Sequence, residues 1–317
     1  MAVVRHFSRE GLVFDVIDQG PRDGDVVVLL HGFPQGAETW QRVVDRLAQA
    51  GYRTLAPNQR GYSPGARPRG ARHYSLRAVK EDVLAMLAQA GVARAHVVGH
   101  DWGGAVAWAL AAADPGASAP YPVTAADPVT PANPITSVTV VSTPHPGALT
   151  AALLQGQALR SWYMLLFQVR GLAERAMHPD GRGWRLAMRG VPENLQAAYA
   201  ARMREEGALS AALSWYRAIP RELVSPTAPR GPSVVPSWFV WGARDPALGR
   251  TAAEATSRFV SAPYRFVVLP DAGHWIPERN ADTLSDLIIR QLNGPQVSQR
   301  PQRGPGAARR PGSEAVG

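Results

Sequence analysis

Short apolar runs alternate with longer amphipathic segments along most of the chain. The apolar runs predict six β-strands, at Val26–Leu30, Thr54–Ala56, His96–Val98, Ser137–Val141, Trp238–Trp241 and Phe266–Leu269. Most of these runs are continuous rather than alternating, which is typical of strands covered on both faces. Helical periodicity predicts helices at Trp40–Gln49, Leu76–Ala90 and Gly103–Ala113. This alternation predicts an α/β fold, with a mainly parallel central sheet flanked by helices.

The regular alternation stops after Val141 and resumes near Ser237. The intervening chain has helical character at Ala148–Gly171 and Glu193–Ala218, which predicts a helical cap inserted into the sheet domain. The segment Asp114–Ile135 has no clear period and is predicted to be a long loop. We therefore expect four parts: core residues 1–146, cap residues 147–222, core residues 223–292, and a disordered basic tail at 293–317, rich in Pro and Gly.

Composition narrows the classes of protein that the chain can belong to. The 317 residues include 45% hydrophobic ones and no cysteine, which excludes disulfides, thiolate metal sites and a cysteine nucleophile. The net charge is +9, and the tail carries four arginines against one glutamate, so a solvated extension explains part of this charge better than nucleic-acid binding does. No signal peptide or membrane-spanning run is recognisable, so we expect a cytoplasmic protein.

One motif suggests nucleophilic catalysis. A predicted strand runs directly into Gly99-His100-Asp101-Trp102-Gly103, and a predicted helix follows. Glycines on both sides of a central residue permit the strained strand-to-helix turn that projects a nucleophile at the carboxyl end of a strand. Asp101 stands where a serine hydrolase has its serine. The simpler interpretation is that Asp101 only caps the next helix.

Two later residues favour the nucleophile. Asp245 lies in a loop after one predicted strand, and His274 lies in a loop after the next. The order of nucleophile, acid and histidine is that of α/β-hydrolase triads. Each residue taken singly fits an ordinary surface loop, whereas the set of three is much less common by chance. We therefore predict an Asp101–Asp245–His274 catalytic set.

The sequence His31-Gly32-Phe33-Pro34 follows the first long strand. In this position the backbone N–H groups of Phe33 and Trp102 are predicted to form an oxyanion hole. The alternative is an ordinary Gly-Pro turn. For His31 and His100 we expect structural hydrogen bonds only.

An aspartate nucleophile restricts the electrophile. Attack on a saturated carbon gives an alkyl ester, which water activated by a histidine can cleave, whereas attack on an ester substrate would give a reactive anhydride. The substrate is therefore expected to be an epoxide or a haloalkane. An epoxide leaves as an alkoxide and needs an O–H donor, which tyrosine supplies because it stays protonated at neutral pH.

From about Leu12 to Leu292 the chain resembles the epoxide hydrolases of the α/β-hydrolase superfamily, in both motifs quoted above and in two aromatic cap segments. These segments are Ser161–Gln168, which contains Tyr163, and Ser214–Arg217, which contains Tyr216. The resemblance implies that both tyrosines bind and protonate the oxirane oxygen, and that Asp245 and His274 form the charge-relay pair. The alternative is that the two tyrosines are only packed aromatics of the cap.

The resemblance implies a small-molecule epoxide as substrate and neither a metal nor an organic cofactor. Haloalkane dehalogenases share the Asp-containing turn, but Phe33 occupies a position that is often Asn in that group, although Trp102 could still donate to a halide. A non-catalytic, ligand-binding member of the fold is a further alternative. Asn58 departs from the family pattern, which often has Asp there. The sequence does not decide between a monomer and a homodimer.

Overall fold

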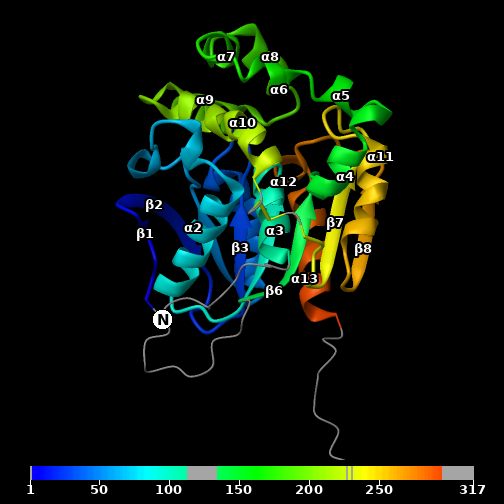
Figure 1. Ribbon diagram of the computed structural model, residues 1–317. Coiled ribbons are helices and arrows are strands. Elements are labelled where there is room, and N and C mark those ends of the chain that lie inside the picture. Colours follow the sequence, from blue (N-terminus) through cyan, green and yellow to red (C-terminus); the bar gives the residue numbers. More distant parts are fainter. Residues whose placement is uncertain (1, 113–133, 226–227, 230, 295–317) are drawn as a thin grey trace, which may run out of the picture.

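The computed structural model describes residues 2–112, 134–225, 228–229 and 231–294, and its centre is a single eight-stranded sheet (Figure 1). Two strands, β1 (His6–Arg9) and β2 (Leu12–Gln19), precede those predicted from the sequence. The predicted strands are β3 (Val26–Leu30), β4 (Arg53–Pro57), β5 (Ala95–His100), β6 (Ile135–Val141), β7 (Ser237–Gly242) and β8 (Tyr264–Leu269).

The order of strands across the sheet is β1-β2-β4-β3-β5-β6-β7-β8. Strands β3 to β8 are parallel, whereas β1 and β2 pair antiparallel at one edge. The expected α/β-hydrolase architecture, with a mainly parallel sheet flanked by helices, is confirmed. The carboxyl ends of β3, β5, β6, β7 and β8 all meet at the same edge of the sheet, which is where α/β proteins place their sites.

Successive residues of the central strands are buried on opposite faces of the sheet. In β3, Val28 and Leu30 belong to one hydrophobic cluster, while Val27 and Leu29 belong to a second. Helices α2 (Leu76–Gln89) and α3 (Trp102–Ala111) cover the first face. Helices α1 (Gln41–Gln49) and α13 (Ala281–Asn293) cover the second. Burial on both faces explains why these strands are continuous apolar runs.

The remaining core helices are short, namely α11 (Arg250–Ala255) and α12 (Ile276–Arg279). The cap elements lie between β6 and β7 and cover the carboxyl edge of the sheet (Figure 1). They comprise α4 (Pro146–Ala151), α5 (Gln157–Arg160), α6 (Tyr163–Leu166), α7 (Leu172–Met177), α8 (Arg182–Ala187), α9 (Glu193–Arg204) and α10 (Ala208–Val224).

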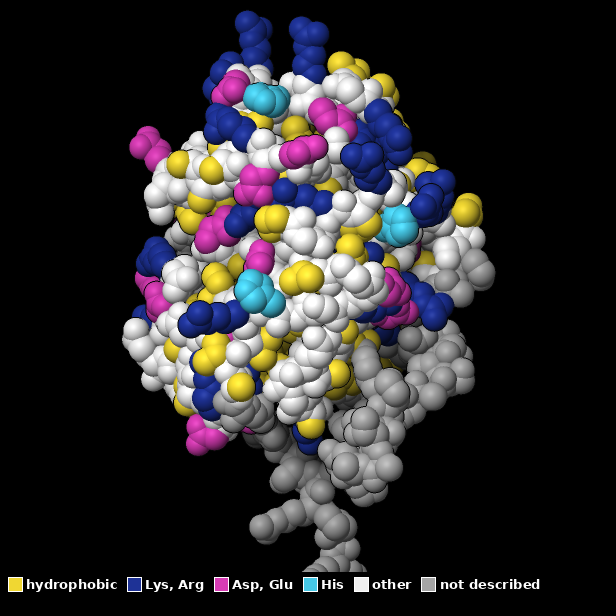
Figure 2. Space-filling model, turned by 90° about the vertical axis from the view of Figure 1, so that its left-hand side faces the viewer, with side chains coloured by type: hydrophobic (Ala, Val, Ile, Leu, Met, Phe, Trp, Pro, Cys, Tyr) yellow, Lys and Arg dark blue, Asp and Glu magenta, His cyan; other side chains and the backbone are white. Residues whose placement is uncertain are grey.

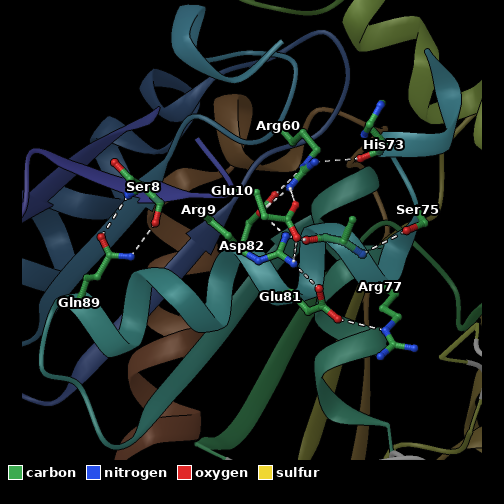
Figure 3. Close-up of polar contacts among 11 residues, drawn as sticks. Ser8, Arg9, Glu10, Arg60, His73, Ser75, Arg77, Glu81, Asp82 and Gln89 are labelled. Carbon is green, nitrogen blue, oxygen red and sulfur yellow. Dashed lines mark hydrogen bonds and ion pairs between the residues drawn. The ribbon is translucent and has the colours of Figure 1, made fainter. Parts of the chain in front are cut away.

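A buried ion cluster joins the edge strands to α2 (Figure 3). The guanidinium of Arg60 donates to both carboxylate oxygens of Asp82, at 2.8 and 2.7 Å, and Arg9 reaches Asp82 at 3.1 Å and also contacts Glu81. The backbone carbonyl of Arg60 accepts a hydrogen bond of 2.9 Å from the indole N–H of Trp215 in α10. The cluster therefore fixes the loop on which this cap helix rests.

Several details differ from the sequence-based expectations. Helix α1 begins at Gln41, because Ala37–Trp40 forms a 3-10 turn whose first N–H donates to Asn58 at 2.9 Å. Helix α13 and the strand pair β1–β2 were not predicted. The predicted loop at 114–135 and tail at 293–317 lie almost wholly outside the described residues. Within the described part of the chain, no helix is both long and apolar enough to cross a bilayer.

Candidate active site

Asp101 lies at the sharp turn between β5 and α3 with φ 53° and ψ −119°, a conformation that non-glycine residues rarely adopt. The turn is possible because its neighbours are glycines. A Cβ on Gly99 would collide with the carbonyl of Gly103, and one on Gly103 would collide with the carbonyl of Leu30. The side chain of Asp101 accepts no hydrogen bond from α3, so the simple helix-cap interpretation does not hold.

Each oxygen of the Asp101 carboxylate has a different neighbour. The backbone N–H of Phe33 donates to Oδ1 at 2.8 Å, while Oδ2 lies 3.6 Å from Nε2 of His274. The hydroxyl of Thr143, just after β6, donates to the backbone carbonyl of Asp101 at 2.7 Å. Gly32 leaves room for this approach, because a Cβ there would overlap the Asp101 side chain. The predicted contribution of the Trp102 N–H to an oxyanion hole stays a prediction.

His274 is held between two carboxylates. Its Nδ1 lies 2.8 Å from Oδ2 of Asp245, and its Nε2 faces Asp101. The second oxygen of Asp245 accepts the N–H groups of Ala247 and Leu248, at 2.8 and 3.0 Å, so this carboxylate is fully engaged on the side away from the histidine. The structure thus brings together the three residues that the sequence singled out.

Residues behind the site hold the loop of His274 in place. Its backbone carbonyl lies 2.9 Å from Nε2 of His100 and accepts the hydroxyl of Ser142 at 3.1 Å. Burial lowers the pKa of His100 to about 3, and burial likewise lowers that of His31 to about 4. Both rings are buried within hydrogen-bonding distance of neighbouring groups, in agreement with the structural role expected for them.

Charge distribution sets the protonation of the central pair. Burial lowers the pKa of His274, but the carboxylates of Asp245 and Asp101 outweigh burial and raise it well above its usual value. Burial raises the pKa of Asp101, but His274, His100 and the Phe33 N–H together bring it below its ordinary value. These shifts favour an ionised Asp101 and a protonated His274.

The two cap tyrosines line the same cavity as Asp101. Tyr163, Tyr216, Asp101 and Trp102 all line one cavity of about 280 Å³, whose other walls are mainly apolar. The rings of the tyrosines are 6.1 Å apart at 74°, and that of Tyr216 also packs edge-on against Trp102 and Phe33. Burial, with Asp101 nearby, raises the pKa of both tyrosines, which keeps their O–H groups protonated.

The segment that carries Tyr163 is hydrogen-bonded to the loop that carries Asp245. The buried side chain of Gln157 donates to the carbonyl of Ala247 at 2.8 Å and accepts the N–H of Gly249 at 2.9 Å. Arg160 donates to the carbonyls of Asp245 and Pro246, at 3.3 and 3.0 Å. These contacts fix the position of one cap tyrosine relative to the triad.

The sequence interpretation missed Thr143 and Gln157. Thr143 could have been found by position, because it lies two residues after the carboxyl end of β6, at the same edge as Asp101. Gln157 gives no such signal, because its partners are backbone groups of a distant loop. Among the described residues, no group of three or more His, Cys, Asp or Glu side chains is arranged to hold a metal ion.

Comparison with known proteins agrees with this geometry. A family described as the alpha/beta hydrolase fold matches residues 25–281. The chain therefore belongs to the alpha/beta hydrolase fold family. It is 30% identical over 296 residues to the AB hydrolase superfamily protein YfhM of Bacillus subtilis, an alignment covering 90% of this chain and 96% of that protein.

Epoxide hydrolases are among the similar proteins. Epoxide hydrolase A of Mycobacterium tuberculosis is 29% identical over 331 residues, which cover 92% of this chain and 97% of that protein. The crystal structure of epoxide hydrolase A from Mycobacterium thermoresistibile superimposes with a TM-score of 0.75 at 26% identity, covering 92% of this chain and 98% of that one. The chain is thus an epoxide-hydrolase-like α/β-hydrolase, and the resemblance expected from its motifs is confirmed.

Proposed function

We propose that this protein hydrolyses epoxides to vicinal diols through a covalent alkyl ester on Asp101. The observation that supports the proposal is that Asp101 and two tyrosines, Tyr163 and Tyr216, line one mainly apolar cavity. An aspartate in this position attacks saturated carbon productively, and a tyrosine O–H can protonate the alkoxide that an opening epoxide releases. The epoxide hydrolases among its relatives support the same substrate class.

The hydrogen bonds of Asp101 support different roles for its two carboxylate oxygens in the proposed reaction. Because Oδ1 already accepts the N–H of Phe33, Oδ2 is the oxygen that attacks a ring carbon. The C–O bond of the ring breaks as the new ester bond forms, and Tyr163 or Tyr216 transfers its proton to the departing oxygen. Oδ1 then becomes the carbonyl oxygen of the ester and stays against the Phe33 N–H.

Hydrolysis of the ester uses His274. Once Asp101 is esterified it has lost its negative charge, so the imidazolium loses one of the two carboxylates that stabilised it, and its proton can pass to solvent. Neutral His274 takes a proton from water, and the hydroxide attacks the ester carbonyl. The Phe33 N–H stabilises the oxyanion on Oδ1, with the Trp102 N–H as the second expected donor. Collapse of this intermediate releases the diol, whose ester oxygen takes the proton of the newly formed carboxyl group, and restores the Asp101 carboxylate. A proton from solvent, equivalent to the one that His274 released, returns the tyrosinate to its O–H form.

Trapping the ester tests the proposal. A His274→Gln protein keeps its nucleophile and both tyrosines but has no base for the second step. Incubated with terminal and internal epoxides, it should gain the whole mass of the epoxide in intact-protein mass spectrometry, since ring opening expels no fragment. Peptide mapping should place the added mass on Asp101. A haloalkane should give neither an adduct nor halide.

Asp101→Asn is the matched control, because a neutral amide is a poor nucleophile and should acquire no adduct. The proposal fails if His274→Gln turns over like the wild type, or gains no mass from an epoxide that the wild type hydrates. Halide release without diol formation would identify a dehalogenase instead, and ligand binding without any turnover would identify a non-catalytic binding protein.

A further inference from the structure

Most of the exposed large hydrophobic side chains in the described part of the chain lie in the cap. Five of them form what we call the cap stripe, with exposed fractions from 51% to 81%: Leu159, Trp162, Leu165, Val169 and Leu172. Their spacing of three, three, four and three residues is that of one face of a helix. A helix of a globular protein normally buries such a face, so the cap stripe requires a separate explanation.

The backbone supports a common face for most of the cap stripe. Between Gln157 and Val169, two four-residue helices, α5 and α6, carry Leu159 and Leu165, and hydrogen bonds of helical type join Ser161 N–H to Gln157, Phe167 N–H to Tyr163 and Val169 N–H to Leu166. The opposite side of this segment carries the buried Gln157 and Phe167 and the half-buried Tyr163. The segment thus has an inner face that holds the site together and an outer face that is apolar.

Charge distinguishes the partners that this surface could bind. The sequence 153–172 contains Arg160 and Arg170 but no acidic residue, and the exposed Arg175 follows shortly afterwards. The face seen in Figure 2 carries Lys and Arg, Asp and Glu, and hydrophobic side chains intermingled at its cap end. Two copies of the protein that met through the same surface would bring arginines against arginines. An anionic surface would instead neutralise them.

The wall of the cavity reaches solvent at Leu153, six residues before the cap stripe begins. Leu153 and Leu223 line the cavity and are themselves 39% and 58% exposed, and the fully exposed Leu154 follows directly in the chain. An apolar substrate dissolved in a lipid phase would therefore reach the cavity without crossing bulk water. A surface of exposed apolar groups flanked by cations next to such an opening matches the properties of interfacial membrane-binding segments.

We propose that the cap stripe and its arginines dock the protein on the surface of an anionic lipid bilayer. The apolar side chains enter the region between headgroups and acyl chains, and Arg170 and Arg175 contact lipid phosphates or carboxylates. The proposal concerns binding alone and does not depend on the reaction that the cavity supports.

Vesicle sedimentation with the full-length protein tests it. The protein should sediment with vesicles of phosphatidylcholine and phosphatidylserine, much less with phosphatidylcholine alone, and less as salt is raised. The double variant Leu159→Ser/Leu165→Ser should weaken binding by about ten-fold or more. Arg170→Gln/Arg175→Gln should weaken it by roughly twenty-five-fold, since each cation near an anionic surface contributes roughly five-fold.

Matched controls separate this surface from general effects of charge and hydrophobicity. Val13→Ser alters an exposed apolar residue of β2, and Arg94→Gln/Arg258→Gln removes two exposed cations of the core, so these variants should bind like the wild type. The proposal is overturned if the wild type does not bind anionic vesicles at low salt. It is also overturned if the cap-stripe variants bind as well as the wild type, which would assign binding to another region such as the basic tail.

Light scattering after size-exclusion chromatography tests whether a second copy of the protein, rather than a bilayer, covers the cap stripe. The wild type and Leu159→Ser/Leu165→Ser should have the same mass in solution. A wild-type dimer that this double variant dissociates would show that the cap stripe is a subunit interface and would overturn the membrane proposal.

Discussion

Replacing Asp101 should lower the pKa of His274. The two side chains are mostly buried, and Nε2 of His274 lies 3.6 Å from Oδ2 of Asp101. At an effective dielectric constant of about 20, a pair of unit charges at this distance interacts by about 4 to 5 kcal/mol. Removing the negative charge withdraws that stabilisation from the imidazolium, while Asp245 still supports it at 2.8 Å. The pKa of His274 should therefore fall, because the charged form of the histidine is the one that loses its partner.

Nuclear magnetic resonance of histidine-labelled protein measures this directly. The signal of His274 is identified by its absence from His274→Gln, and its titration is compared among the wild type, Asp101→Asn and Asp101→Ala. The alanine variant guards against deamidation of the asparagine. Asp271→Asn removes an exposed carboxylate three residues from His274 and should leave the titration unchanged. A His274 pKa that is the same with and without Asp101 would refute the argument that esterification prepares this histidine as a base.

Three further predictions concern groups around the site. Tyr163→Phe and Tyr216→Phe should each slow ring opening in single-turnover measurements, raising the activation free energy by up to about 3 kcal/mol. The double variant should lose ring opening almost wholly, and a wild-type rate in it would show that the tyrosines only pack. Gln157→Leu should slow ring opening by roughly ten-fold, since it removes hydrogen bonds worth about 1 kcal/mol each, and this effect should vanish in a Tyr163→Phe background. Arg60→Leu should lower the free energy of unfolding in urea by about 3 kcal/mol, since it leaves a buried carboxylate without its main partner; replacing both partners should cost less, and equal costs would contradict this account.

Much of the fold could be predicted because the order of apolar and polar residues along the chain decides which segments the hydrophobic effect buries. Val26–Leu30 is apolar throughout, and its burial on both faces follows from that. Strand β2, which lies next to the edge strand β1, was missed because Asp15 and Asp18 interrupt its apolar residues, so it lacks such a run. Antiparallel pairing at the edge depends on backbone hydrogen bonds that any sequence can make, so it leaves little trace in the sequence.

The candidate triad was predictable because each member lies in the turn or loop that follows a strand, and parallel strands bring their carboxyl ends together. The contacts that support the candidate triad could not be predicted from the sequence. Gln157 binds backbone groups of residues 247 and 249, so nothing in its own sequence context indicates its partner. Likewise, the burial of the Arg60–Asp82 pair depends on how α10 and α2 pack, which no local pattern encodes.

The position of the cap in the chain has a consequence for how this enzyme class can diversify. Residues 142–236 leave the sheet at the end of β6 and return at the start of β7, and these two strands are adjacent and paired. For a segment with fixed ends, doubling its length raises the closure cost by only about 0.6 kcal/mol. Insertions or deletions between these two points that leave Thr143, Gln157 and both tyrosines in place therefore cost the sheet little stability and leave the surroundings of Asp101 intact. The cavity walls and the outer surface of the cap can thus vary while the residues proposed for the reaction stay in place.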